Sequence, residues 1–109
     1  MTLSIQDREI LANRIVPLVT AELMARLRAD TAPPYEADIV EVLDFVRRNP
    51  DPDLPRYAIV RIEDGFEVVV RARTPGRPPE FVDGVRYPDR GAAEFAVLAR
   101  RLKDYGVTW

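Results

Sequence analysis

The chain has 109 residues, 47% of them hydrophobic, a net charge of −2, and neither cysteine nor histidine. This length and composition are typical of one globular domain with a modest core, so we expect a single domain over residues 1–109. The missing residue types exclude disulfides, thiol nucleophiles, imidazole bases and the commonest metal ligands, and we expect no catalytic residue, metal or cofactor in this chain.

The charge is distributed unevenly along the chain. Residues 1–55 carry 6 Arg and 10 Asp or Glu, a balance of −4, whereas residues 56–109 carry 9 Arg, 1 Lys and 8 Asp or Glu, a balance of +2. The preference for Arg reflects either coding bias or the suitability of guanidinium groups for interfaces. No apolar run approaches the ~18 residues of a membrane span, and no signal-peptide pattern opens the chain, so we expect a cytoplasmic protein without a membrane segment.

The first helix is predicted from apolar residues at helical spacing between Ile10 and Leu27. Ser4 can cap its start, with Asp7 three residues later. Pro17 should kink or split the helix, because its ring clashes with the carbonyl group four residues earlier. The apolar sector is wide, which indicates burial on two sides, either by this chain's own second helix and sheet or by a second chain.

A second helix is predicted over about Tyr35–Arg48, after a proline-containing stop at residues 30–34. Arg47 and Arg48 in its last turn suit the helix dipole. Residues 49–55 contain three prolines and form a linker. The helical part therefore covers residues 1–49, and the sheet with its helix covers residues 56–106. The core-facing residues of the second helix are Tyr35, Ile39, Val42 or Leu43, and Val46.

A β-hairpin is predicted from residue 56 onward. A three-residue loop of Glu63, Asp64 and Gly65 would pair Ile62 with Phe66, Val60 with Val68 and Ala58 with Val70, leaving one face wholly apolar. We predict this register in preference to a turn of Asp64 and Gly65 alone, which would mix charge into that face. The other face then mixes apolar and charged residues, namely Tyr57, Ile59, Arg61, Glu67, Val69, Arg71 and Arg73.

The remaining elements are a third strand over Phe81–Tyr87, with Gly84 as a candidate bulge, and a helix from Pro88 to Gly106 capped by Asp89. Trp109 either folds back onto the domain or anchors an interface. The expected fold class is α+β: two N-terminal helices, a three-stranded antiparallel sheet and a C-terminal helix packed on the sheet. The buried row of that last helix is predicted to be Phe95, Leu98, Ala99 and Leu102.

Nucleic-acid binding is one functional hypothesis. Three antiparallel strands followed by a helix is the layout of phage-type integrase arm domains, and a helix before three strands is similar to double-stranded-RNA-binding domains. Arg61, Arg71 and Arg73, with Tyr57, could form a basic, aromatic face that enters a groove. Glu67 on the same face, the acidic first half and the near absence of lysine oppose it, because phosphate contacts dominate affinity. We therefore treat it as the alternative.

A family resemblance rests on residues between positions 34 and 104. They are Pro34-Tyr35, Arg48, Pro50, Tyr57-Ala58-Ile59, Pro79, Arg86-Tyr87-Pro88, Ala93-Glu94 and Leu98 to Asp104. In this order of helices and strands, the chain resembles the small (light) subunit of N,N-dimethylformamidase and related short accessory subunits. The resemblance implies that the metal and the hydrolytic residues lie in a large partner subunit, and that the present chain is non-catalytic.

The leading hypothesis is therefore an accessory subunit that docks on a larger enzyme subunit, an amidohydrolase or another enzyme, and stabilises or regulates it. Apolar and Arg residues side by side on a surface are typical of interfaces. A third hypothesis is a stand-alone adaptor whose wide first helix self-associates. The candidate partner-interface residues are Tyr57, Ile59, Val69, Arg71, Arg73 and Trp109.

Overall fold

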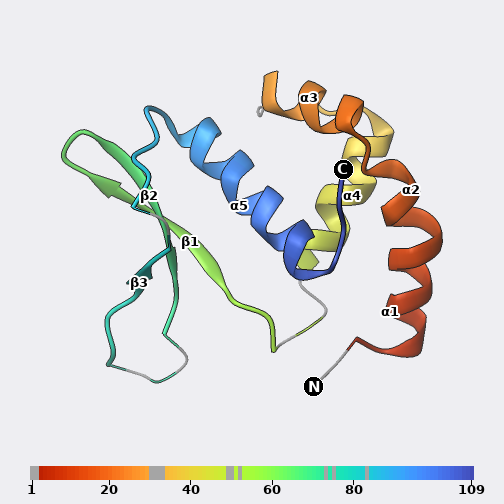
Figure 1. Ribbon diagram of the computed structural model, residues 1–109, viewed down its shortest axis with the longest axis horizontal. Coiled ribbons are helices and arrows are strands. Elements are labelled where there is room, and N and C mark those ends of the chain that lie inside the picture. The colour runs from red at the N-terminus through yellow and green to blue at the C-terminus, as the bar shows by residue number, and fades with distance from the viewer. Residues whose placement is uncertain are drawn as a thin grey trace.

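The computed structural model describes residues 3–29, 34–48, 51, 53–72, 74, 76–82 and 84–109. The fold is α+β and has the expected order of helices, antiparallel sheet and C-terminal helix. In Figure 1, α5 lies between the sheet on one side and the N-terminal helices on the other. The elements are α1 (Ile5–Ile10), a π-helical turn η1 (Leu11–Ile15), α2 (Val16–Leu18), α3 (Ala21–Ala29), α4 (Ala37–Arg48), β1 (Tyr57–Ile62), β2 (Gly65–Val70), β3 (Glu80–Phe81) and α5 (Arg90–Asp104).

The first predicted helix is split, as the position of Pro17 indicated. The Ser4 hydroxyl caps α1 by accepting a hydrogen bond from the Asp7 backbone N–H at 3.1 Å. The π-helical turn η1 comes immediately before Pro17, and such a turn widens the helix where the proline ring would crowd it. The chain then leaves the helix at Val19, which is extended, and Thr20 caps α3.

The main core lies between the N-terminal helices, α4 and α5. Most of the wide apolar sector of the first helical region is buried there by this chain itself, although Ile5 remains 78% exposed. The buried members of this core are Ile15, Val19, Leu23, Met24, Leu27, Ile39, Val42, Leu43, Phe45, Val46, Leu98, Leu102 and Val107. The second helix thus has the predicted core row, although α4 begins at Ala37 and Tyr35 precedes it.

An ion-pair cluster joins α3 to the start of α4. The Arg26 guanidinium pairs with Glu22 at 2.8 Å, with Glu36 at 3.1 Å and with Asp38 at 2.5 Å. The hydrogen bond from Arg26 holds the pKa of the Asp38 carboxyl below its usual value, and the same bond raises the pKa of Arg26. Both residues are therefore charged at neutral pH, and the cluster links the two helices.

The predicted hairpin register is wrong by one residue. Ile62 pairs with Gly65 and Val60 with Glu67, so the loop consists of Glu63 and Asp64 only. Gly65 belongs to β2 because the returning chain passes close beside it: a Cβ at this position would lie 2.5 Å from the carbonyl oxygen of Tyr87. The consequence is that neither face of the hairpin is wholly apolar.

The predicted third strand is too long. β3 covers only Glu80–Phe81 and pairs with the end of β2, and contact with β2 resumes as an isolated bridge between Phe66 and Tyr87. The chain from Phe81 to Tyr87 is three residues longer than the matching part of β2, so an irregular segment containing Gly84, at φ 65°, separates the two pairings. The expected interruption at Gly84 is therefore larger than a single bulge.

Both ends of α5 follow the sequence prediction. Asp89 caps the start by accepting a hydrogen bond from the Ala92 N–H at 2.8 Å. At the other end Gly106 has φ 81°, and the N–H groups of Gly106 and Val107 bind the carbonyls of Lys103 and Leu102, which is a Schellman motif. Val107 is buried in the main core, so the predicted tail is in part core. The buried row is Ala93, Val97, Leu98 and Leu102, with Phe95 and Ala99 only partly buried.

Candidate functional site

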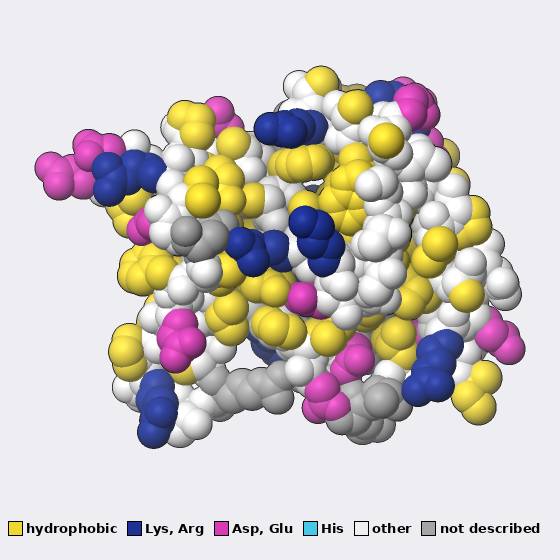
Figure 2. Space-filling view, viewed as in Figure 1, with side chains coloured by type: hydrophobic (Ala, Val, Ile, Leu, Met, Phe, Trp, Pro, Cys, Tyr) yellow, Lys and Arg dark blue, Asp and Glu magenta, His cyan; other side chains and the backbone are white. Residues whose placement is uncertain are grey.

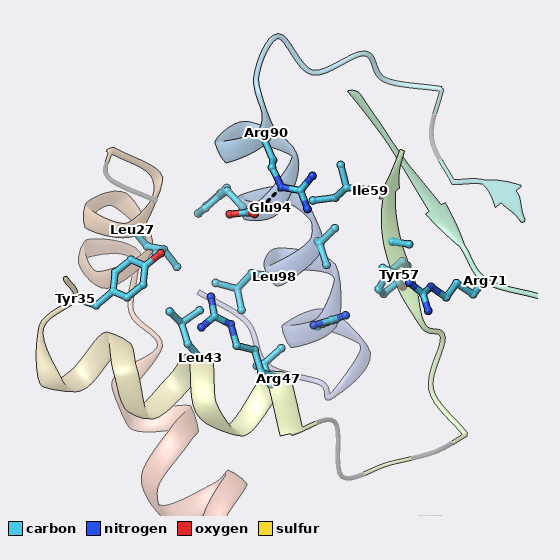
Figure 3. Close-up of a pocket in the computed structure, with 15 residues that line it drawn as sticks. Leu27, Tyr35, Leu43, Arg47, Tyr57, Ile59, Arg71, Arg90, Glu94 and Leu98 are labelled. Carbon is cyan, nitrogen blue, oxygen red and sulfur yellow. Dashed lines mark hydrogen bonds and ion pairs between the residues drawn. The ribbon is translucent and has the colours of Figure 1, made fainter. Parts of the chain in front are cut away.

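A cleft of about 350 Å³ lies between the helical part and the sheet. In Figure 3 its floor is α5, one wall is α4 with the end of α3, and the other wall is β1 with the residue after β2. We call it the arginine groove. Its lining residues are Leu27, Tyr35, Leu43, Val46, Arg47, Tyr57, Ala58, Ile59, Arg71, Arg90, Glu94, Phe95, Val97, Leu98 and Arg101.

The groove is strongly positive. Four arginines line it against a single carboxylate, Glu94, and that carboxylate already pairs with Arg90 at 3.2 Å. Arg47, Arg71 and Arg101 form no ion pair with any residue that the structure describes. Burial lowers the pKa of Arg101, and the nearby positive charge of Arg47 lowers it further. The groove thus offers three guanidinium groups that no described carboxylate pairs with, beside the Arg90–Glu94 pair.

Aromatic and aliphatic side chains surround these charges. The Tyr57 hydroxyl donates a 2.6 Å hydrogen bond to Asp104 Oδ2, and burial together with this bond raises the pKa of Tyr57 to about 12. The Arg28 guanidinium lies 5.8 Å from the centroid of the Phe95 ring. Figure 2 shows Lys and Arg side chains among hydrophobic side chains near the centre of this face of the molecule. Arginine beside aromatic rings is a composition enriched at protein interfaces.

The structure brings only some of the predicted interface residues together. Tyr57, Ile59 and Arg71 line the groove. Val69 is 1% exposed and lies on the opposite sheet face from Ile59, so it has no surface to offer a partner. Arg73 lies outside the described residues. Trp109 is away from the groove lining and 41% exposed, with Lys103 Nζ 5.8 Å from its ring centroid.

The sequence prediction missed the groove residues that come from helices. Arg47 was expected to serve the helix dipole, and Arg101 lies outside the predicted buried row of the last helix. A signal for α5 was present, because groove residues recur along it at spacings of four, four and three, which is one helix face. These residues are Arg90, Glu94, Leu98 and Arg101. Their convergence with Arg47 and Arg71 depends on tertiary packing and could not be read from spacing.

In the described part of the chain, no three or more acidic residues come together in a group that could hold a metal ion. Among the helices that the structure describes, none is long and apolar enough to cross a bilayer.

Comparison with known proteins gives one finding. The family described as the N,N-dimethylformamidase alpha subunit matches residues 1–108. No curated protein and no solved structure matches the chain. The match includes the N-terminal helices as well as the region from residue 34 to residue 104, and it confirms the enzyme to which the sequence resemblance pointed. The family description calls the subunit alpha. That this chain is the small subunit of the enzyme therefore stays a prediction.

Proposed function

Because the chain belongs to the family of the N,N-dimethylformamidase alpha subunit, we propose that it is the small accessory subunit of a hydrolase complex and docks on a larger, catalytic subunit. The match over residues 1–108 is the observation that carries this proposal, because it includes nearly the whole chain. The family description supports amide hydrolysis as the reaction of the assembled complex.

An accessory role is supported by the state of the reactive groups in the groove. A hydrolytic site needs a positioned nucleophile, base or metal. The Glu94 carboxylate is paired with Arg90, and the Tyr57 hydroxyl is committed to Asp104 with a pKa raised to about 12. The Tyr57 phenol is thus protonated at neutral pH and does not act as a base, and the Glu94 carboxylate is engaged by an arginine. The groove is suited to hold a negative group, and we assign catalysis to the partner.

The contact surface that we propose combines the arginine groove with exposed apolar side chains. Tyr57, Ile59 and Arg71 lie in the groove, and Trp109 remains 41% exposed elsewhere. Phe81 on the edge strand β3 is 59% exposed. Large exposed apolar side chains next to arginine are typical of a surface that a partner covers. A cytoplasmic address and self-association through the first helical region stay predictions.

Nucleic-acid binding is the second candidate, and the arginines without ion-pair partners favour it. The observed register opposes it, because the predicted basic sheet face is divided. Tyr57 and Arg71 line the groove, whereas Arg61 is not among the residues that line it. A concave groove also receives a ligand and does not enter a nucleic-acid groove. A salt-dependent shift of duplex DNA or RNA that Arg71→Glu abolishes would favour this candidate over docking.

The proposed function is tested by producing the tagged chain together with the larger polypeptide encoded beside it. We expect the two to co-elute in size-exclusion chromatography at micromolar concentration. We also expect hydrolysis of N,N-dimethylformamide in the complex and none by the isolated chain. Separate elution of the two polypeptides would contradict docking. Turnover by the isolated chain would contradict the accessory role.

A further inference from the structure

We infer that the arginine groove is the binding site for an extended, carboxylate-bearing segment of the partner subunit. This inference rests on the proposed function and adds to it the place and the chemistry of docking. Arg47, Arg71 and Arg101 reach one cleft from α4, from the end of β2 and from α5, and no described carboxylate neutralises them. A partner carboxylate would supply the missing counter-charge.

The charge of Arg101 lies in an unfavourable environment. Its guanidinium is half-buried, and both burial and the charge of Arg47 act against it. A carboxylate placed between the two would remove that repulsion and form bidentate hydrogen bonds, which the planar guanidinium favours. Such a pair is stronger in a partly desolvated groove than on an open surface, because the effective dielectric constant is lower.

The dimensions of the groove favour an extended segment. Its floor runs from Arg90 to Arg101 on α5, which at 1.5 Å per residue is roughly 16 Å. About five residues of extended chain span the same distance. One wall of the groove is β1, which is an edge strand of the sheet.

The lining also indicates the composition of the segment. Leu43 and Leu98 line the groove with Arg47, and Figure 3 shows the Arg47 side chain extending from α4 toward Leu98, beside Leu43. A segment that matches both the arginines and the apolar side chains of the lining would alternate acidic residues with aliphatic or aromatic ones. Acidic side chains would meet the arginines, and apolar side chains would cover the leucines and Phe95.

Charge reversal in the assembled complex tests the inference. The variants Arg47→Glu and Arg101→Glu place a negative charge in the groove, whereas Arg77→Glu makes the same change at an exposed position outside it. We expect each groove variant to raise the Kd for the large subunit at least about tenfold, and the control to stay within about twofold. Equal Kd values for all three variants and the wild type would overturn the inference.

Arginine labelling provides a test that needs no variant. Phenylglyoxal modification of the wild-type chain, mapped by mass spectrometry, is compared between the free chain and the complex. We expect Arg47 and Arg71 to be labelled about tenfold more slowly in the complex, while Arg77 keeps its rate. Labelling of Arg47 and Arg71 at the same rate in both states would overturn the inference.

A small free anion is the competing occupant. Inorganic phosphate and acetate at millimolar concentration are therefore added to the free chain in the labelling experiment. Protection of Arg47 and Arg71 by either ion, together with an unchanged Kd in the groove variants, would overturn the inference in favour of a small-anion site. A wild-type chain that forms no complex would overturn the proposed function itself, whereas a complex with unprotected arginines would overturn this inference alone.

Discussion

Tyr57 shows how one side chain joins the sheet to the helical part. It begins β1, and its hydroxyl donates a hydrogen bond to Asp104 at the end of α5, 2.6 Å away. Burial and this bond keep the phenol protonated, and its pKa rises to about 12. Tyr57 also lines the arginine groove, so this hydrogen bond fixes the position of one lining side chain.

The first prediction concerns the titration of Tyr57. Spectrophotometric titration at the phenolate absorbance should show one tyrosine ionising at pH about 12, and this component should be missing in Tyr57→Phe. Because the folded-state pKa is raised above the ordinary tyrosine value of about 10, the stabilisation is present below pH ~10 and is lost as the pH rises toward the folded-state pKa. We expect Tyr57→Phe to cost about 1 kcal/mol at neutral pH.

The matched control for this prediction is Tyr87→Phe, since Tyr87 pairs with β2 through its backbone. The component at pH about 12 should remain in that variant. A Tyr57→Phe variant that keeps this component would show that another tyrosine, such as Tyr105, whose pKa burial also raises, is its source.

The candidate site was predictable where it depends on strand residues and not where it depends on packing between helices. The sequence pointed to Tyr57, Ile59 and Arg71 because apolar and charged residues are mixed there. It gave no indication of Arg47 and Arg101, since each looks like an exposed residue in the last turn of its helix. Their positions in the groove follow from the angle between α4 and α5, which is a property of the packed core.

At the level of elements, the hairpin shows why a polarity rule selected the wrong register. The rule assumed that one face is covered along its whole length. In Figure 1 the hairpin tip projects beyond α5, so the tip has no cover that would require apolar pairs. Arg61 opposite Phe66 and Glu67 opposite Val60 are tolerated there. The close approach of Tyr87 to Gly65 then decides the register, and this contact comes from a distant part of the sequence.

Helix boundaries were predictable to within a few residues because they depend on local chemistry. Ser4 and Asp89 cap α1 and α5 through their own side chains, and Gly106 ends α5 with a positive φ. The first helical region has a π-helical turn just before the Pro17 turn and breaks at Val19, two residues after Pro17. Each of these effects involves atoms within about one helical turn, so the sequence contains the necessary information.

The second prediction concerns the link between α3 and α4. Asp38→Asn removes the carboxylate that binds Arg26 most closely, so we expect a Tm at pH 7 lower by on the order of a few degrees. The folded-state pKa of Asp38 is depressed, so its stabilisation is present above the unfolded-state pKa of about 3.9 and is lost as the pH falls through the folded value. Thermal unfolding of both proteins from pH 7 to pH 2 measures this.

Asp44→Asn is the control for the second prediction. Asp44 is an exposed residue of the same helix and has no ion pair among the described residues. We expect its Tm to follow that of the wild type at each pH. A constant Tm difference between Asp38→Asn and the wild type down to pH 2 would show that the cluster with Arg26 does not stabilise the fold through charge.

On the scale of the whole molecule, α5 is the element that packs against both the N-terminal helical part and the sheet. Its Leu98 and Leu102 belong to the main core with the N-terminal helices. Its Ala93 and Val97 are buried outside the main core. The buried strand residues are Val68 and Val69, which lie on opposite faces of β2. The sheet therefore depends on few buried side chains, and the helical part depends on many.

The third prediction follows from this unequal distribution of buried residues. Native-state hydrogen exchange should show that the amides of β1 and β2 open at a lower free energy than those of α4 and α5, because fewer buried contacts hold the hairpin. Leu102→Ala, at a side chain with no exposed surface, should cost about 3 kcal/mol and lower protection in both parts. Val68→Ala should cost about 2 kcal/mol and lower protection in the hairpin alone.

Together, the two variants test whether α5 couples the helical part to the hairpin or whether the two parts open independently. If Leu102→Ala lowered protection in α4 and left the hairpin unchanged, α5 would not couple the two parts. If Val68→Ala lowered protection in α4 as much as in β2, the chain would unfold as one unit. The expected pattern has a consequence for docking, since a segment that binds in the arginine groove touches β1, α4 and α5 at once. Such a segment should raise the opening free energies of the hairpin and of α4 by the same amount, because either opening would destroy the groove that binds it.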